Sequence, residues 1–150
     1  MRPIYETEDD VQNELAVVKD LCSGLNCSYK KLPISYGLDY ALIREDDVFA
    51  FIEIKCRKRH SQRHESLMVS AQKRVKAQEL TRATGVPCML VSSFSDGVYW
   101  INFAEKPDKV TFNGRTDRGD AQDVEPVIHY ATERLTLVLA GVTTSGEGSK

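Results

Sequence analysis

A pair of charged residues inside an apolar run constrains the fold of this chain more than any other feature. The run 48–56 is apolar in its first five residues and then contains Glu53 and Lys55. A second apolar run, 38–44, precedes it and is separated from it by the acidic residues 45–47. Two short apolar runs joined by a few polar residues are typical of a β-hairpin. The sequence therefore predicts two antiparallel strands with a turn at residues 45–47.

The position of this turn decides which side chains face each other. With the turn centred on Asp46, Asp39 faces Glu53, and the same register pairs Ala41 with Phe51 and Ile43 with Phe49. Like charges at directly opposed positions destabilise a sheet, and a divalent cation between the two carboxylates would offset their repulsion. Because side chains alternate along a strand, Lys55 lies on the same face as Glu53. The hairpin is thus predicted to bring two acids and a lysine together.

This arrangement, Asp39 and then Glu53-x-Lys55, resembles the hairpin motif of the PD-(D/E)XK nuclease superfamily, which includes phage, resolvase and restriction-type nucleases. Leu38 stands where the superfamily's name places a proline. An acid-x-lysine pattern alone is common, but buried strands seldom contain Glu and Lys unless these residues are paired or functional. The alternative reading is a partly buried ion pair at the end of a strand.

The order of the predicted elements agrees with the resemblance. It implies an α/β, restriction-endonuclease-like core in which helices flank a central mixed sheet, in the order α-β-β-α-β-β. Amphipathic periodicity predicts the helices, and short apolar runs predict the strands. We expect one domain over residues 1–142, with its core at 8–103, and a flexible tail at 143–150. The expected elements are helices at 8–22 and 65–84, the hairpin, strands at 88–91 and 98–103, and added strands at 109–112 and at 127–130 or 135–139.

The resemblance also implies a metal site. Asp39 and Glu53 would hold Mg²⁺, with Mn²⁺ as a possible substitute and the backbone carbonyl of Ile54 as a further ligand. Lys55 would be the catalytic lysine, and the superfamily's usual products are a 5′-phosphate and a 3′-hydroxyl. The helix before the hairpin often supplies another acid, and Glu14 fits because it lies on the apolar side of that helix. A Glu14 that reaches solvent or a lysine is an equally open alternative.

Basic residues are concentrated after the hairpin. Residues 55–84 contain nine Lys or Arg and two Glu, a local charge of +7 in a chain whose net charge is −2. Cationic side chains bind nucleic acid by neutralising phosphates and releasing counterions. Arg57, Lys58 and Arg59 continue the strand of Glu53 and are predicted to contact DNA. On the second helix we expect Lys73, or less strongly Gln72, to contact phosphate; a solvated helix face is the alternative.

Other classes of protein fit the sequence less well. We expect no membrane span, a location in the cytoplasm (that of the host for a phage-encoded chain), and reduced cysteines. Cys22 and Cys27 are too far in sequence from His60 and His64 for a zinc finger. The sequence therefore predicts a Mg²⁺-dependent deoxyribonuclease, an endonuclease that hydrolyses phosphodiester bonds. The open alternatives are an inert nucleic-acid-binding module of the same fold and a homodimeric restriction-type or junction-resolving enzyme.

Overall fold

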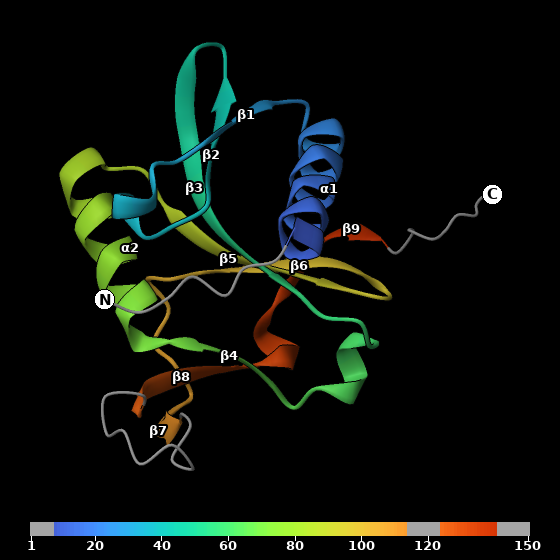
Figure 1. The fold of residues 1–150 in the computed structure, drawn as a ribbon, viewed down its shortest axis with the longest axis vertical. Coiled ribbons are helices and arrows are strands. Elements are labelled where there is room, and N and C mark those ends of the chain that lie inside the picture. Colours follow the sequence, from blue (N-terminus) through green and yellow to red (C-terminus); the bar gives the residue numbers. More distant parts are fainter. Residues whose placement is uncertain (1–7, 114–123, 141–150) are drawn as a thin grey trace.

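The computed structural model describes residues 8–113 and 124–140, which form two sheets and two α-helices (Figure 1). The larger sheet has the strand order β1-β2-β3-β5-β6-β9, and the smaller one has the order β4-β8-β7. The helices are α1 (Glu8–Leu25) and α2 (Ala71–Thr84). The strands are β1 (Ser28–Lys31), β2 (Tyr40–Arg44), β3 (Asp47–Cys56), β4 (Ser66–Ser70), β5 (Cys88–Phe94), β6 (Gly97–Asn102), β7 (Lys109–Asn113), β8 (Glu125–Ala131) and β9 (Thr136–Ala140).

The predicted hairpin is formed by β2 and β3. Glu45 and Asp46 have φ angles of 53° and 70°, as in the two-residue turns whose twist matches that of antiparallel strands. Ala41 faces Phe51, as predicted. A register shift follows Leu42, so Ile43 faces Val48 and the predicted pair of Ile43 with Phe49 is wrong. The shift lies near the turn, and the predicted register holds at the other end of the hairpin.

Strand β3 occupies the middle of the larger sheet, between β2, which is antiparallel to it, and β5, which is parallel to it. Its side chains alternate between two cores. Ile52 and Ile54 pack with α1, whereas Phe51 packs in the core that includes Ala77 of α2 and the smaller sheet. Figure 1 shows α1 and α2 on opposite sides of the β2–β3 hairpin. By this alternation Glu53 faces α2.

The second helix begins later than predicted. Residues Ser66–Ser70 form β4, which pairs with β8, and α2 begins at Ala71 with the Ser70 side chain as its N-cap. Leu67 and Val69 are buried in β4, while Met68 between them is 41% exposed, which is the two-residue period of a strand. The predicted helix over 65–84 is therefore wrong in its first part. Its end is confirmed, because Gly85 is a left-handed C-cap with φ 77°.

The C-terminal segment expected at 109–112 forms a strand, and so do both of the alternatives 127–130 and 135–139. β9 extends the larger sheet beside β6, whereas β7 and β8 form the smaller sheet with β4. The short strand β1, at the edge beyond β2, was not predicted. The polar loop at 113–123 and the tail at 143–150 lie largely or wholly outside the described residues. In the described part of the chain, neither helix is long and apolar enough to cross a membrane.

Candidate active site

Glu53 is a buried carboxylate with two ammonium groups beside it. Its side chain is 5% exposed. Nζ of Lys73, in the first turn of α2, lies 3.3 Å from Oε1, and Nζ of Lys55 lies 3.8 Å from Oε2. A buried carboxylate needs such partners, because burial without compensation costs several kcal/mol. Glu53 and Lys55 lie on one face of β3, as predicted, and their contact is also the ion pair that the alternative reading expects.

Asp39 lies across the hairpin from Glu53. It directly precedes Tyr40, which faces Ile52, and its backbone N–H donates to the carbonyl of the same Ile52 at 2.9 Å. Its negative charge acts on Glu53, so the two carboxylates lie near each other. Its Oδ2 accepts a hydrogen bond from the backbone N–H of Ile54 at 2.7 Å. The Asp39 carboxylate is thus held at the end of β2 by the backbone of β3. The structure brings together the two acids that the register predicts.

The electrostatics of the site hold a proton on Glu53 at unusually high pH. Burial is the main cause, and the negative charge of Asp39 acts in the same direction. The positive charges of Lys73 and Lys55 act in the opposite direction, and the pKa of Glu53 is raised to about 7. Nearby positive charge favours the ionised form of a carboxylate. A further cation beside Glu53 would therefore stabilise its charged state near neutral pH.

The donor atoms at this site suit a hard divalent cation. Oε1 of Glu53 is buried and accepts no well-oriented hydrogen bond from the described residues. The N–H and C=O of one strand residue point toward the same neighbouring strand. Because the Ile54 N–H donates to Asp39, the Ile54 carbonyl also points toward the chain segment that contains Asp39. Asp39 directly precedes Tyr40, the first residue of β2 that pairs with β3. Two carboxylates and a carbonyl are the oxygen ligands that Mg²⁺ takes, usually together with several waters.

Glu14 is placed differently from the two hairpin acids. It is half-buried on α1, in the same helical row as the buried Val18 and Leu21. That helix covers the face of β3 that carries Ile52 and Ile54, opposite to Glu53. Within residues 8–113 and 124–140, no three His, Cys, Asp or Glu side chains form a metal-binding group. The role of Glu14 as a metal ligand therefore stays a prediction.

Lys73 lies inside the candidate site. Besides its ion pair with Glu53, its Nζ donates a hydrogen bond to the Gly37 carbonyl at 2.7 Å. The sequence predicts Lys73 on the second helix as a contact to phosphate, and it does not predict the ion pair with Glu53 or the hydrogen bond to Gly37. Gln72 is exposed, and its backbone N–H donates to the Ser70 cap. A phosphate contact by either residue stays a prediction.

The basic loop, residues Arg57, Lys58 and Arg59, is fixed to the turn between β5 and β6. The Arg57 N–H donates to the Ser93 carbonyl at 2.7 Å, and the Ser95 N–H donates to the Arg59 carbonyl at 3.0 Å. Lys58 and Arg59 are exposed, and Arg57 is half-buried. The loop therefore presents its cations from an ordered backbone next to the end of β3.

Asp96 anchors the segment that follows the basic loop. Its Oδ1 accepts from the Ser61 N–H, and its Oδ2 accepts from the Ser61 and Tyr99 hydroxyls, all at 2.7 Å. His60 Nε2 lies 3.7 Å from the same Oδ2. These hydrogen bonds outweigh the effect of partial burial and lower the pKa of Asp96 to about 2. The anchor is therefore ionised throughout the physiological range.

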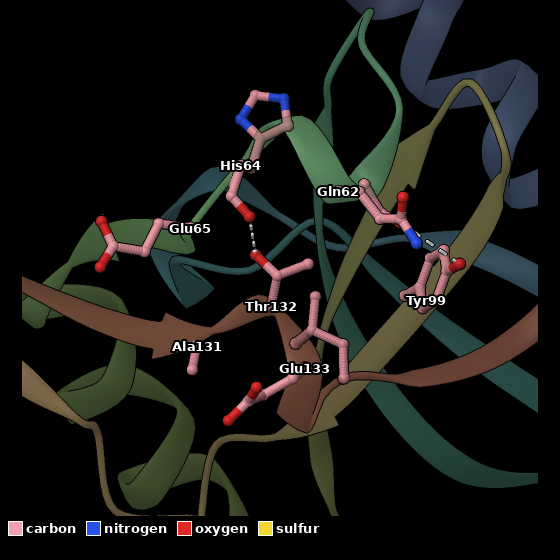
Figure 2. A pocket seen from close by; sticks show the side chains of 9 residues that line it. Gln62, His64, Glu65, Tyr99, Ala131, Thr132 and Glu133 are labelled. Atoms are coloured by element: carbon pink, nitrogen blue, oxygen red, sulfur yellow. Dashed lines mark hydrogen bonds between the residues drawn. The ribbon is translucent and has the colours of Figure 1, made fainter.

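A hollow of about 640 Å³ lies beyond this anchor, between the short 3₁₀ turns Ser61–Arg63 and Thr132–Arg134 (Figure 2). Glu65 and Glu133 are among the nine residues that line it, and none of the nine is Lys or Arg. Carboxylates without cations repel phosphate. The hollow also contains none of the hairpin residues Asp39, Glu53 and Lys55. The candidate active site is therefore the cluster around Glu53.

Comparisons with known proteins give a family for the chain and a similar fold. The model of a family described as phage putative PDDEXK endonuclease matches residues 1–138, a range that includes the whole hairpin. The fold is similar to that of Hjc, a Holliday junction resolvase from the archaeal hyperthermophile Archaeoglobus fulgidus, with a TM-score of 0.52 and 15% sequence identity. That likeness covers 66% of this chain and 78% of the resolvase. No curated protein matches the chain. The predicted restriction-endonuclease-like α/β fold is confirmed.

Proposed function

Because the chain belongs to the family of phage putative PDDEXK endonucleases, we propose that it is a Mg²⁺-dependent DNA endonuclease whose active site is built on Glu53. The observation that carries the proposal is the buried Glu53 carboxylate, which faces Asp39 and lies beside Lys55 and Lys73. A strongly altered carboxylate pKa beside specific charged partners is typical of functional sites. A phosphodiester together with a divalent cation matches both the acids and the ammonium groups.

Asp39 and Glu53 would hold Mg²⁺, or Mn²⁺ in its place, with the Ile54 carbonyl and Glu14 as candidate further ligands. When bound, the ion supplies charge stabilisation at the scissile phosphate and lowers the pKa of water. The backbone N–H of Ile54 orients Asp39, and burial fixes Glu53. Both carboxylates are therefore in place before a ligand arrives, which avoids a reorganisation cost during the reaction.

Lys55 acts on the reacting phosphate. Its ammonium group orients the attacking water or stabilises the charge that develops on the phosphorane. In an in-line displacement the water oxygen forms a bond to phosphorus while the bond from phosphorus to the 3′ oxygen breaks. The water gives up a proton, the 3′ oxygen takes one up, and the products are a 5′-phosphate and a 3′-hydroxyl. Lys73 positions the Glu53 carboxylate, because it holds Oε1 and the Gly37 carbonyl together.

The basic loop would bind the DNA backbone on either side of the cut. Arg57, Lys58 and Arg59 follow directly after β3, so they continue the strand that carries Glu53 and Lys55. Phosphate contacts of this kind fix the register of a protein on DNA without reading sequence. The ordered backbone of the loop supports this role, because rigid presentation lowers the entropy cost of binding.

Closed circular DNA provides the decisive test of this function. Incubation with Mg²⁺, with Mn²⁺ and with a chelator should show nicking or linearisation only with the cations. Asp39→Asn should abolish cutting, whereas Asp46→Asn should not, because Asp46 is an exposed acid at the far end of the same hairpin. DNA binding without any cation-dependent cutting would instead make the chain a binding module of this fold.

A further inference from the structure

The loop between β1 and β2 exposes two large apolar side chains beside the candidate active site. The 3₁₀ turn of this loop, Ile34–Tyr36, lies in the segment 33–37, which ends two residues before Asp39. Ile34 is 80% exposed and Tyr36 is 49% exposed. Figure 1 shows this turn next to α2. Exposed apolar groups cost free energy in water, so a pair at the edge of a site indicates a contact surface.

This apolar loop, residues 33–37, is held in one conformation. Lys73 joins it to the site, since one Nζ lies 2.7 Å from the Gly37 carbonyl and 3.3 Å from Glu53 Oε1. Gly37 has a φ of 80°, and a Cβ there would lie 2.9 Å from Cγ of Lys76. Glycine is therefore required at this position, both for its backbone conformation and for the close approach of α2. The position of Tyr36 relative to Glu53 is fixed by these contacts.

A hollow of about 240 Å³ separates the loop from α2. Tyr36 lines it on the loop side, and Leu80 and Ala83 provide apolar contacts on the helix side. Lys76, one helical turn after Lys73, and Glu79 supply polar groups at the same hollow. A flat ring system with hydrogen-bonding edges matches this combination of one aromatic face, apolar contacts and a few charged groups.

We infer that the apolar loop binds an unstacked base of the DNA strand that is cut, with the base lying against the Tyr36 ring and Ile34 at the edge of the contact. The inference rests on the proposed nuclease function and names the part of the substrate that this surface recognises. Lys76 lines the hollow beside one acid, Glu79, and Lys73 lies one helical turn before Lys76. These ammonium groups suit the phosphates that flank a base, which favours a nucleic acid over an apolar protein segment. Aromatic stacking is tolerant of base identity, so the contact would select for unpaired structure and not for sequence.

The test compares binding of single-stranded and duplex oligonucleotides in chelator, where no cutting occurs. Tyr36→Ser should weaken single-strand binding roughly ten-fold, since stacking on one aromatic side chain is worth about 1–3 kcal/mol. Tyr36→Phe should bind like the wild type, because it keeps the ring. Phe112→Ser is the matched control: Phe112 is 76% exposed but lies on β7 in the smaller sheet. The dependence of affinity on salt should not change in Tyr36→Ser, because no phosphate contact is lost.

Photo-crosslinking gives a second readout that does not depend on affinity. A strand carrying 5-iodouracil at successive positions should crosslink to Tyr36 at one or two adjacent positions, and Tyr36→Ser should lose this adduct. Wild-type affinity in Tyr36→Ser, an equal loss in Phe112→Ser, or dissociation of a dimer by Tyr36→Ser in sedimentation would overturn the inference. If the wild type cuts DNA and Tyr36→Ser binds single strands with wild-type affinity, this inference is wrong and the proposed function stands. A wild-type chain that neither binds nor cuts DNA would overturn the proposed function as well.

Discussion

Lys73 and Glu53 form an ion pair of 3.3 Å between the first turn of α2 and the middle of β3. The carboxylate is 5% exposed, and the same ammonium group holds the Gly37 carbonyl. Lys73 thus neutralises the buried acid and ties the β1–β2 loop to it. The pair links three segments that are distant in sequence, and its charge balance controls the state of Glu53.

Replacement of Lys73 by Met should therefore change the pH dependence of cutting. Loss of the positive charge raises the pKa of Glu53 further above its ordinary value, because Lys73 is the stronger of the two groups that lower it. Because the pKa of Glu53 starts at about 7, at limiting Mg²⁺ we expect the single-turnover rate at pH 7 to fall about five-fold for the first unit of increase in this pKa and about ten-fold for each further unit. The rate should recover at pH 9, where Glu53 is ionised again. Arg82→Met, an exposed cation in the last turn of the same helix, should leave the profile unchanged.

The stability of the metal-free protein should fall as pH rises from about 4.5 to about 7. The pKa of Glu53 is about 7 in the folded chain and 4.5 in its ordinary state, so the folded state binds the proton more tightly. This contribution is present below pH 4.5 and is lost as pH rises through 7, with a total of up to about 3 kcal/mol. Denaturant unfolding of wild type and Glu53→Gln at pH 5 and pH 8 measures it. The difference in unfolding free energy between wild type and Glu53→Gln should change between pH 5 and pH 8 in favour of the variant. An unchanged difference would contradict the raised pKa of Glu53.

Metal binding should depend on the negative charge of Asp39. Calorimetry with Mn²⁺ and Mg²⁺ should show binding to the wild type that is lost in Asp39→Ala together with cleavage. Asp39→Asn separates charge from structure, because its amide oxygen can still accept the hydrogen bond from Ile54. We expect this variant to stay folded and to lose both metal binding and cutting. Undiminished cleavage in a folded Asp39→Ala would sink the assignment of the metal site.

The basic loop should contribute to DNA binding in a salt-dependent way. Conversion of Arg57, Lys58 and Arg59 to Ala should reduce the slope of log affinity against log salt by about 0.9 for each lost phosphate contact with duplex DNA. Lys19→Ala, an exposed lysine on α1, is the control that should keep the wild-type slope. A triple variant with the wild-type slope would mean that these side chains only face solvent.

The hairpin could be predicted from the sequence because its pattern leaves little freedom. Apolar alternation decides which face each side chain takes, because a shift by one residue would move every side chain to the other face. The predicted turn at residues 45–47 is one residue too long, since Arg44 already faces Asp47, and the register shift after Leu42 offsets this difference. The local shift after Leu42 escaped prediction because the residues beside it, Ile43, Val48 and Phe49, are all apolar and tolerate either partner. Tyr40 faces Ile52 in the predicted register, and the charge of Asp39, the residue before Tyr40, acts on Glu53, so the proximity of the two acids followed from the sequence.

The start of α2 could not be predicted in the same way. The segment Ser66–Ser70 is only five residues long, and its pattern fits either a strand or the first turn of a helix. Pairing with β8, about sixty residues later in the chain, decides in favour of a strand. The contacts of Lys73 depend on that helix start and on the conformation of Gly37, so they were beyond sequence reasoning. Such tertiary pairing commonly overrides local propensity.

Lys55 should be required for the chemical step and not for DNA binding. Lys55→Met keeps most of the packing of the side chain and removes an interaction that is made mainly in the transition state. Loss of one preorganised electrostatic group costs on the order of 10²–10³ in rate, so single-turnover cutting under saturating DNA and Mg²⁺ should fall by at least that much. DNA affinity should change far less.

The pH dependence separates this role from a purely electrostatic effect on Glu53. Lys55 also lowers the pKa of Glu53, though less than Lys73 does, so part of the loss at pH 7 could arise from protonation of that acid. At pH 9 Glu53 is ionised in both variants. We therefore expect Lys73→Met to regain most of the wild-type rate at pH 9, while Lys55→Met stays 10²–10³ slower. If Lys55→Met also recovers at pH 9, Lys55 is only an ion-pair partner of Glu53, and the water at the phosphate is oriented by another group.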